Sequence, residues 1–440
     1  MSRFVTVDRD TDYLLPPSVS DWLTEDHLAG FVVEVIDRLD LSELTRQYAG
    51  RGSKAHHPAV LLGLLIYGYA TGVFSSRKIE RASYDSIAFR YIAANTHPDH
   101  DTIATFRRRF LPQLEDLFVQ VLLLAREMKL VKLGRIALDG TKIKANASKH
   151  KARSYAHVKK IEQQLKAEVK ALTAQAEEAD QTPVIDGMDL PAEIARREVR
   201  LKALDAAKLK IEERAKERVE REQVGYQSKQ EKRQAQRDAG KKPKGPEPKP
   251  PQPGPKDKDQ VNLTDEESRI MPVSGGGFEQ CYNAQASVDT ETMLVMSTHV
   301  TQAANDKQQI EPALHSLAAL PDKLGKVTDL LGDTGYFSAN NVELCTQANI
   351  QPLLAVARDH HHLSVFERFA PDSPVPETGE PLALMGHRLR KQTVEPVFGI
   401  IKHVMGFRQF SMRGLDKVSG EWTLATLAWN VKRMNALRMV

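Results

Sequence analysis

Two stretches of this chain share a design that restricts how it can fold: an apolar run ends in an aspartate close to a glycine. Residues 135–141 read RIALDGT, and residues 330–336 read LLGDTGY. Short apolar runs of this kind are typical of buried β-strands. In α/β folds, functional groups gather at the edge of the sheet where such strands end. Asp139 and Asp333 are therefore candidate metal ligands, provided that the fold brings the two strands together.

The sequence offers a third carboxylate, Glu395, in a segment that we predict to be helical, residues 390–402. The predicted buried stripe of this helix consists of Val394, Phe398 and Ile401. Lys391, Glu395 and Lys402 would share another face, with Lys402 about 10 Å beyond Glu395 at 1.5 Å per residue. A surface helix with ordinary salt bridges would show the same spacing. Two strand-end aspartates that need a further ligand favour the metal-site interpretation.

The pattern around these residues predicts an α/β domain. Besides the strand of Asp139, strands are expected at residues 282–288, 294–301, 327–331 and 351–357. Three strands followed by alternating helices and strands describe a mixed five-stranded sheet flanked by helices. We expect residues 131–150 to supply the first strand and residues 278–440 to supply the remainder of this domain.

The segment between these two parts has a different composition. Residues 149–258 carry about 27 basic and 19 acidic side chains and almost no aromatic ones, as in a solvated helical region. Apolar residues recur at helical spacing from Val158 to Leu172 and again within residues 193–235. The pattern predicts an inserted, charged antiparallel hairpin within residues 151–277, for which a coiled coil is one candidate form. Residues 241–255 alternate lysine, proline and glycine and are expected to form an extended, flexible linker. The hairpin could bind DNA, mediate dimerisation, or simply connect the parts of the chain on either side of it.

The first part of the chain, residues 1–130, is expected to be all-helical. Thr24 is the expected N-cap of a helix over residues 25–39, and Asp101 or Thr102 that of a later one. In the later helix, Arg107 and Arg108 should point outward. Short helices with exposed arginines favour a reader of duplex DNA, although a solvated basic face has the same appearance.

Composition limits the class of protein without choosing a function. The chain has 440 residues, 41% of them hydrophobic, so a real core and two or three domains are expected. A net charge of +4 permits a polyanionic partner. Two cysteines without paired spacing argue against a disulfide scaffold or a structural zinc site. Its N-terminus does not read as a signal peptide, and its most apolar run is too short to span a membrane. We therefore expect a soluble protein of a reducing cytosol.

Three gathered carboxylates suit phosphodiester chemistry. Two divalent ions can activate water or a 3′-hydroxyl and stabilise the leaving oxygen. Magnesium prefers oxygen ligands and keeps several waters, so a few carboxylates suffice. The sequence carries no Walker-type phosphate loop, no nucleophile elbow and no HExxH zinc motif.

Three motifs, in the order LDGT (residues 138–141), GDTGY (332–336) and VEPVFG (394–399), resemble those of bacterial insertion-sequence DDE transposases. The resemblance is to the insertion-sequence 1182-like group, within the larger transposase clan with a ribonuclease-H-like core. Residues 282–285 (YNAQ) and 428–433 (AWNVKR) fit the same family. This resemblance implies a cytoplasmic, nucleoid-associated bacterial protein. Expected partners are the element's terminal inverted repeats and target DNA, with a dimer in the synaptic complex.

The resemblance also assigns residues. Asp139, Asp333 and Glu395 would be the catalytic residues and the ligands of a two-metal site for Mg²⁺, with Mn²⁺ as a substitute. Candidate DNA-binding residues are Lys402, Lys391, Arg390, Arg388, Arg413, Arg107 and Arg108. Some relatives carry a tyrosine and an arginine seven and four residues before the glutamate. Arg388 and Lys391 stand there in this chain, with Arg390 as the candidate for the arginine's role. Hairpin and hairpin-free excision are both left open.

Several rival residues have plainer explanations. Asp289 is expected in a hairpin turn and Asp306 as a helix cap. Asp329 lies inside the second aspartate strand, away from its glycine turn, and Glu421 should open the last helix. Tyr336 is expected to pack in the interior.

Two other functions stay open, a non-catalytic DNA-binding relative and a metal-dependent nuclease that cuts without joining.

Overall fold

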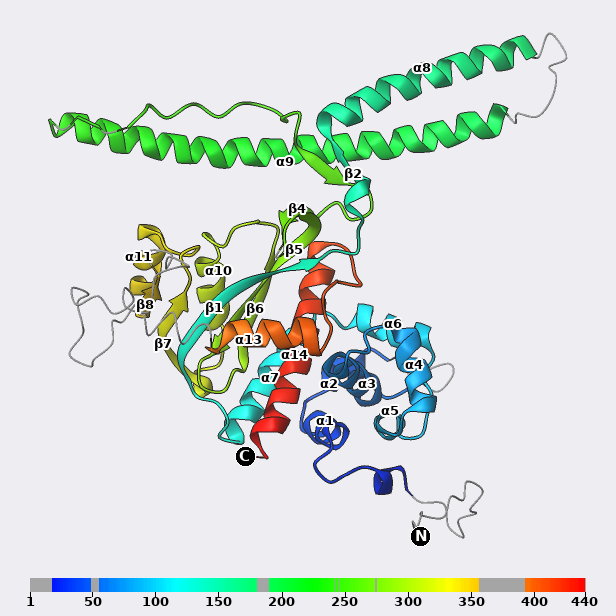
Figure 1. Cartoon of the computed structure of the whole chain (residues 1–440), viewed down its shortest axis with the longest axis vertical. Helices are drawn as coiled ribbons and strands as arrows, with labels where there is room; N and C mark the ends of the chain where they lie inside the picture. Colours follow the sequence, from blue (N-terminus) through cyan, green and yellow to red (C-terminus); the bar gives the residue numbers. More distant parts are fainter. Residues whose placement is uncertain are drawn as a thin grey trace, which may run out of the picture. The chain divides into compact units, whose positions relative to one another are not determined.

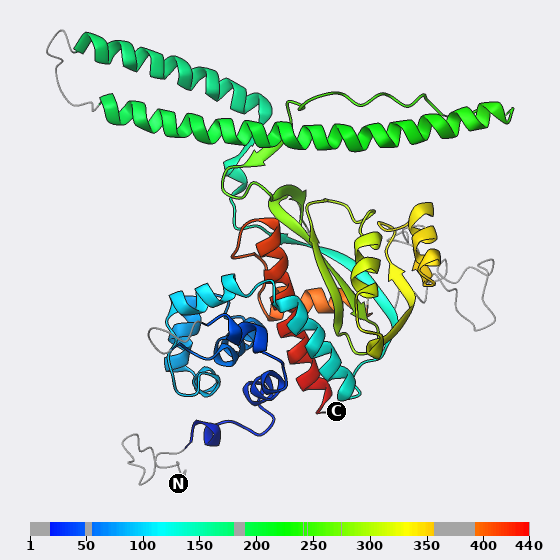
Figure 2. The ribbon, with the colours of Figure 1, turned by 180° about the vertical axis from the view of Figure 1, so that it is seen from behind.

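The computed structural model describes residues 18–48, 55–179, 190–240, 242–243, 245–273, 275–355 and 392–439 (Figures 1 and 2). The chain divides into two compact units. The first unit joins residues 1–143 with residues 282–440, and the second comprises residues 144–281. The candidate ligands Asp139, Asp333 and Glu395 all belong to the first unit.

The first part of the chain is helical, as expected. After the short η1 (Val19–Trp22), its helices are α1 (Leu28–Asp37), α2 (Ser42–Arg46), α3 (Pro58–Thr71), α4 (Ser76–Asp85), α5 (Ile87–Ile92), α6 (His100–Arg109) and α7 (Leu114–Glu127). Two predicted caps are wrong. His27 caps α1 instead of Thr24, because its Nδ1 accepts a hydrogen bond from the backbone N–H of Ala29. Asp99 caps α6 through the N–H and hydroxyl of Thr102.

Helix α14 (Leu415–Leu437) joins these helices to the sheet, since it packs on α1, α3 and α7 and also on β6 (Val295–Thr301) (Figure 2). Its polar side chains pair with strand backbone. The Asn430 side chain accepts from the N–H of Val295 and donates to the carbonyl of the same residue, at 2.8 and 2.7 Å. Trp422 is fully buried and donates from Nε1 to the carbonyl of Gln285. The helix therefore satisfies backbone groups that would otherwise be buried without partners.

The sheet of the first unit contains the five expected strands. They are β1 (Leu133–Lys144), β5 (Phe278–Asp289), β6, β7 (Gly325–Gly332) and β8 (Gln351–Leu354). Their order is β6-β5-β1-β7-β8; β1, β7 and β8 run parallel, and β5 and β6 antiparallel. The total of five strands is wrong: among the described residues the sheet has six, because β4 (Arg269–Pro272) pairs with residues 278–281 of β5. This mixed sheet and its many helices fit a ribonuclease-H-like core.

Two helices of the first unit follow β6 and β7 along the chain. Helix α10 (Ile310–Ala318) packs on β6, and α11 (Ala339–Gln347) packs on α10 and β8. The 3₁₀ turn η3 (Asp322–Leu324) leads into β7. No single helix in the described part of the chain is long and apolar enough to cross a membrane; α3 and α4 meet those criteria only as a bent pair, by length and composition.

A buried carboxylate, Glu421, ties three segments of the first unit together. It accepts hydrogen bonds from the Tyr69 hydroxyl of α3, from the N–H and hydroxyl of Ser411, and from the N–H of Met412. Burial, and then the neighbouring carboxylate, raise the pKa of Tyr69 well above its ordinary value, so the phenol stays protonated and donates. Glu421 was expected to open the last helix, but it lies six residues after Leu415, the first residue of α14.

The second unit is built on an antiparallel pair of long helices, α8 (Tyr155–Ala179) and α9 (Leu190–Asp238). Contacts between them run in opposite directions along the two helices: Tyr155 bonds Glu212, Glu162 bonds Lys208, and Glu168 bonds Arg197. The apolar cluster between them contains Val158, Leu165 and Leu204, with Ile161 and Leu201 packed against it. The expected hairpin is confirmed, and its apolar stripe is buried within one chain.

At the base of the hairpin, the second unit carries two short strands. They are β2 (Ala152–Ser154), which follows the turn η2 (Lys149–Lys151), and β3 (Gln260–Asn262), and they pair antiparallel. The segment before β3 is extended, as expected of a linker, but it is not free. Arg233 of α9 donates to the carbonyls of Gly245 and Pro246, and Arg218 donates to the carbonyl of Gly254. The described part of residues 241–255 therefore lies along α9.

Removal of the buried carboxylate should destabilise the first unit. We expect Glu421→Gln to lower its stability by about 3 kcal/mol, because several donors lose an ionised acceptor and the new amide places its own donors among them. Thermal unfolding of the full chain measures this. Glu343→Gln on exposed α11 is the control and should leave the melting temperature unchanged; an equal shift in both variants would contradict the role of Glu421.

The hairpin should lose stability in acid. Hydrogen bonds from Lys166 and Lys208 lower the pKa of Glu162 below its ordinary value of 4.5. Because the folded pKa is the lower one, the contribution of Glu162 is complete above about pH 4.5 and is lost as the pH falls through the folded value. Thermal unfolding followed by helix ellipticity across this range should show the loss. Glu162→Gln should remove that part of the pH dependence, whereas Glu213→Gln, at an exposed site on α9, should not.

Candidate active site

The register of β1 and β7 places the two strand-end aspartates side by side. Ile136 pairs with Leu330, and Ala137 pairs with Leu331, in parallel. Asp139 lies within β1 and Asp333 is the first residue after β7, and each follows two residues after that last pair. Neighbouring strands lie about 4.8 Å apart, so the shared register brings the two aspartates to the same edge of the sheet. Residues two apart along a strand share a face, so this register favours the same side of the sheet for both carboxylates.

Each aspartate is held by the backbone that follows it. Asp139 Oδ1 accepts a hydrogen bond from the N–H of Gly140, and Asp333 Oδ1 accepts one from the N–H of Gly335, both at 2.8 Å. A Cβ at Gly335 would lie 2.8 Å from Asp333 Oδ1, which explains the glycine in this turn. Both carboxylates are half-buried. Short bonds to the backbone fix their directions without consuming both oxygens of either group in those bonds.

Glu395 lies in the first turn of α13 (Val394–Gly399) and is exposed. The predicted buried stripe of Val394, Phe398 and Ile401 is confirmed. The regular helix expected through residue 402 is wrong, since α13 passes into a π-helical turn, η5 (Ile400–Val404), in which the N–H of Met405 bonds the carbonyl of Ile400. The wider turn changes the direction of Lys402, so its expected shared face with Glu395 no longer follows from the spacing.

Lys402 instead contacts the strand of the first aspartate. Its Nζ donates to the carbonyl of Lys142 on β1 at 3.0 Å. β7 ends at Gly332, level with Leu138, so the carbonyl of Lys142 lies beyond the paired part of β1 on that side. Lys402 satisfies this carbonyl and thereby holds the α13–η5 segment against β1, three residues from Asp139.

Behind β1, a polar network that the sequence reasoning missed supports both aspartates. Asp306 Oδ1 accepts from the side-chain amides of Asn283 and Gln285, both at 2.6 Å. Tyr336, in the turn after Asp333, is fully buried and donates its hydroxyl to Gln285 Oε1 at 2.5 Å. A Cβ at Gly140 would overlap this network, because it would meet Gln285 Nε2 and lie 2.6 Å from Asp306 Oδ1.

The prediction of Asp306 as a helix cap is therefore wrong. Helix α10 begins only at Ile310, where Gln309 occupies the cap position without a side-chain hydrogen bond. Asp306 lies in the loop after β6 and turns toward β1, with Lys142 Nζ 3.7 Å from its Oδ1. One signal for such a network is visible in the sequence: the polar residues Asn283 and Gln285 alternate with apolar residues in a predicted strand.

The other rival carboxylates have the plain roles that were expected. Asp289 forms a hairpin turn, since its Oδ2 accepts from the backbone of Glu291 and Thr292. Asp329 faces Arg135 across the strands, with 3.7 Å between Oδ2 and Nε. Neither residue is part of the pair formed by the two strand-end aspartates.

The predicted DNA-binding residues have different environments. The outward direction expected for Arg107 is wrong, because its guanidinium donates to the Tyr69 hydroxyl and the Phe74 carbonyl, both at 3.1 Å. Arg108 is exposed, and so is Arg413, just before α14. Candidates outside the described residues are Arg388, Arg390 and Lys391.

Two known protein families match parts of this chain. Residues 17–109 match the family described as Transposase domain (DUF772), and residues 251–431 match the Transposase DDE domain. Together the two matches support a DDE-type transposase family for this chain. The second match contains Asp333 and Glu395, while Asp139 lies between the two matched stretches. No curated protein and no solved structure matches the chain. The DDE domain indicates a family of nucleic-acid-cleaving enzymes that act on DNA.

DDE transposases generally use divalent metal ions, so the ligand set has to be compared with that requirement. Among the described side chains, no group of three or more His, Cys, Asp or Glu is gathered closely enough to hold a metal ion. The two aspartates at one level of neighbouring strands do offer the oxygen ligands that magnesium prefers, and this ion needs few protein ligands because it keeps several waters. The donor chemistry of this pair fits the metal of a DDE transposase.

The network behind β1 predicts a contrast between two glycines of the same strand. Gly140→Ala should lower the melting temperature by several degrees, because the new methyl group must displace Gln285 or Asp306. Gly134→Ala is the control, since a Cβ there meets no atom within 4 Å. Thermal unfolding of both variants measures the difference. Equal melting temperatures would show that the network does not constrain β1.

Proposed function

We propose that this chain is an active DNA transposase of the insertion-sequence 1182-like group. It cuts DNA at the terminal inverted repeats of its element and joins the exposed 3′-hydroxyl to target DNA. The observation that carries the proposal is the parallel register of β1 and β7, which sets Asp139 beside Asp333. The match of residues 251–431 to the Transposase DDE domain supports the same chemistry.

In this proposal, Asp139, Asp333 and Glu395 are the catalytic carboxylates and hold two Mg²⁺ ions, for which Mn²⁺ can substitute. The ions would supply activation of water or of the 3′-hydroxyl and stabilisation of the leaving oxygen. The backbone N–H groups of Gly140 and Gly335 keep the two aspartates directed to one face. Glu395 is the ligand supplied from a helix, and its exposure leaves it accessible to DNA and metal.

The basic residues of the first unit would bind the substrate backbone. Lys402 stands beside the strand of Asp139 and is proposed to contact a phosphate or the terminal nucleotide next to the cleaved bond. The remaining proposed DNA contacts are Arg108, Arg413, Arg388, Arg390 and Lys391. Arg107 is not among them, because its guanidinium holds α6 to Tyr69 and Phe74.

Synapsis of two element ends requires at least a transient dimer on DNA, and we propose that the protein acts as one in the nucleoid of a bacterial cell. Two copies would each bring one terminal repeat to the complex. Imperfect inverted repeats on either side of the gene would identify the substrate directly.

Substitution of the carboxylates tests the catalytic assignment. Asp139→Asn, Asp333→Asn and Glu395→Gln should each reduce cleavage of terminal-repeat DNA by at least 10³-fold, because a ligand of the reacting centre is lost. Binding of the same DNA should change little. Cleavage in Mg²⁺ and end binding by gel shift are the two measurements. Asp329→Asn, on β7 four residues before Asp333, is the matched control and should keep cleavage.

The products distinguish the proposed function from its alternatives. Labelled ends joined to a second DNA identify a transposase, whereas free ends alone identify a nuclease that does not join. A chain that binds the repeats but never cuts them would be a non-catalytic relative. If the protein with all three carboxylates replaced by alanine still cut its repeats, the site assignment would be wrong.

A further inference from the structure

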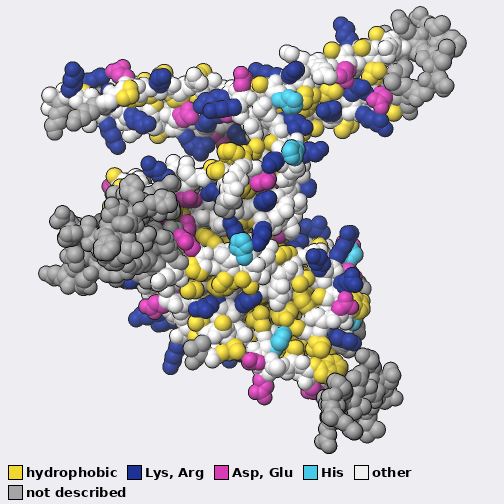
Figure 3. Space-filling view, viewed as in Figure 1, with side chains coloured by type: hydrophobic (Ala, Val, Ile, Leu, Met, Phe, Trp, Pro, Cys, Tyr) yellow, Lys and Arg dark blue, Asp and Glu magenta, His cyan; other side chains and the backbone are white. Residues whose placement is uncertain are grey.

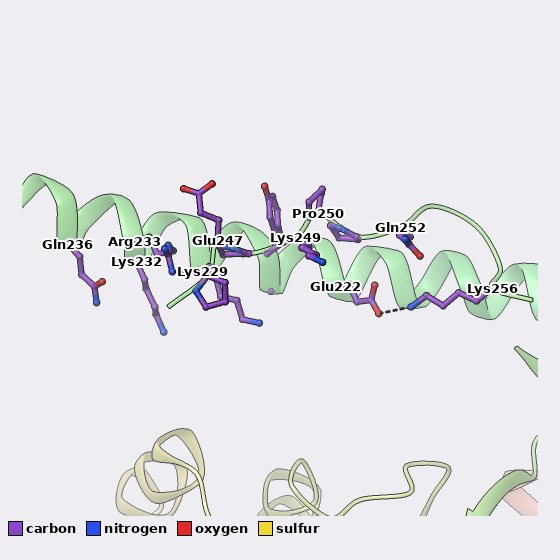
Figure 4. Close-up of a pocket in the computed structure, with 15 residues that line it drawn as sticks. Glu222, Lys229, Lys232, Arg233, Gln236, Glu247, Lys249, Pro250, Gln252 and Lys256 are labelled. Carbon is purple, nitrogen blue, oxygen red and sulfur yellow. Dashed lines mark hydrogen bonds and ion pairs between the residues drawn. The ribbon is translucent and has the colours of Figure 1, made fainter. Parts of the chain in front are cut away.

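The second unit contains a basic groove that the chemistry of the aspartates does not use. Helix α9 continues well beyond the part covered by α8, and the proline-rich segment lies along this uncovered half (Figures 1 and 4). Between helix and segment is a groove of about 790 Å³. Its walls come from α9 between Glu222 and Gln236 and from the segment between Pro246 and Lys256.

Positive charge is concentrated around this groove. The lining residues include five Lys or Arg and two Glu, an excess of three positive charges. In the space-filling view, Lys and Arg side chains gather along the long helices of this unit, with fewer acidic ones between them (Figure 3). This local excess of cations creates a positive potential along the groove.

The acidic residues of the groove are already neutralised. Glu222 has Arg218 at 3.9 Å and Lys256 at 4.0 Å, and Glu247 has Arg237 at 2.8 Å. Arg233 is occupied with carbonyls of the segment. Arg218, Arg233, Arg237 and Lys256 therefore have structural roles, because they hold the segment to α9 or pair with the acidic residues.

Three lysines of the lining have no such partner. Lys229, Lys232 and Lys249 are exposed, and none of them makes an ion pair or a side-chain hydrogen bond within the described part of the chain. Lys229 and Lys232 are three residues apart on α9 and so share a face of the helix. Lys249 comes from the segment opposite them (Figure 4). Their ammonium groups are therefore available to an external anion.

We propose that this groove is a second DNA-binding site, in which Lys229, Lys232 and Lys249 contact phosphates of the duplex backbone. Ammonium groups on flexible stems suit contacts that position DNA without reading its sequence. A proline-rich wall supplies few backbone donors and holds its lysine in an extended, stiff segment. The inference rests on the proposed function for the choice of DNA as the polyanion.

The packing of the hairpin favours this role over self-association. Its apolar cluster is already buried between α8 and α9 of one chain, so dimerisation through that stripe would require the hairpin to open. The exposed lysines of the groove, in contrast, remain available to bind an external anion.

Replacement of the three lysines tests the proposal. The variant Lys229→Gln, Lys232→Gln, Lys249→Gln of the full chain should bind a short labelled duplex of arbitrary sequence more weakly. Fluorescence anisotropy across a salt series, without divalent metal, measures the affinity. The slope of log K against log salt should become shallower by about 2.7, since each lost phosphate contact removes roughly 0.9.

The matched control carries the same change of charge elsewhere on the hairpin. Lys160, Lys170 and Lys202 are exposed lysines on α8 and the covered half of α9, and their replacement by Gln should leave the slope within about one contact of the parent. An equal change of the salt slope in both variants would mean that any surface lysine contributes as much as those of the groove, and it would overturn the proposal. An unchanged slope in the first variant, or equally strong binding of polyglutamate, would also overturn it.

This test is separable from that of the active site. A protein that fails to cut its repeats but shows the expected salt slope retains the groove and loses the catalytic proposal. A protein that cuts and joins normally, with no change in slope for the groove variant, shows the reverse.

Discussion

Parallel pairing of β1 with β7 is the constraint on which the candidate site depends. Parallel strands that share a register present residues of equal depth at the same edge of the sheet, and here those residues are Asp139 and Asp333. A slip of one residue would turn one carboxylate to the opposite face and separate the pair. Ala137 and Leu331, two residues before them, are fully buried, so the apolar core maintains the register that brings the two aspartates together.

A second layer of support lies on the other face of β1. Gln285 is bonded to Asp306 and to the hydroxyl of Tyr336, and the absent side chain of Gly140 leaves room for both amide groups. Because this network touches the strand of one aspartate and the turn of the other, it links their positions. A buried network of this kind is effective only when every member is satisfied, which explains the sensitivity expected at Gly140.

The two units use charge in different ways. In the first unit, the buried carboxylate of Glu421 has several donors and joins α3, α14 and the loop at Ser411. In the second, ion pairs such as Glu162 with Lys208 hold α8 to α9, and arginines fasten the proline-rich segment. The lysines that remain exposed in the groove have no structural partner in the described chain. Structural and available charges are thus carried by different residues.

The sequence alone determined the strands, the helical hairpin, the buried stripe of α13 and the strand-end positions of the two aspartates, because periodicity and strand-end glycines are local signals. It did not determine the caps at His27 and Asp99, the inward turn of Arg107, the π-helical turn at Lys402 or the role of Asp306. Each of these depends on a partner distant in the chain or on a choice among neighbouring polar residues. Adjacency of the aspartates was also decided by tertiary structure, since only the pairing of strands 194 positions apart in the sequence sets their common level.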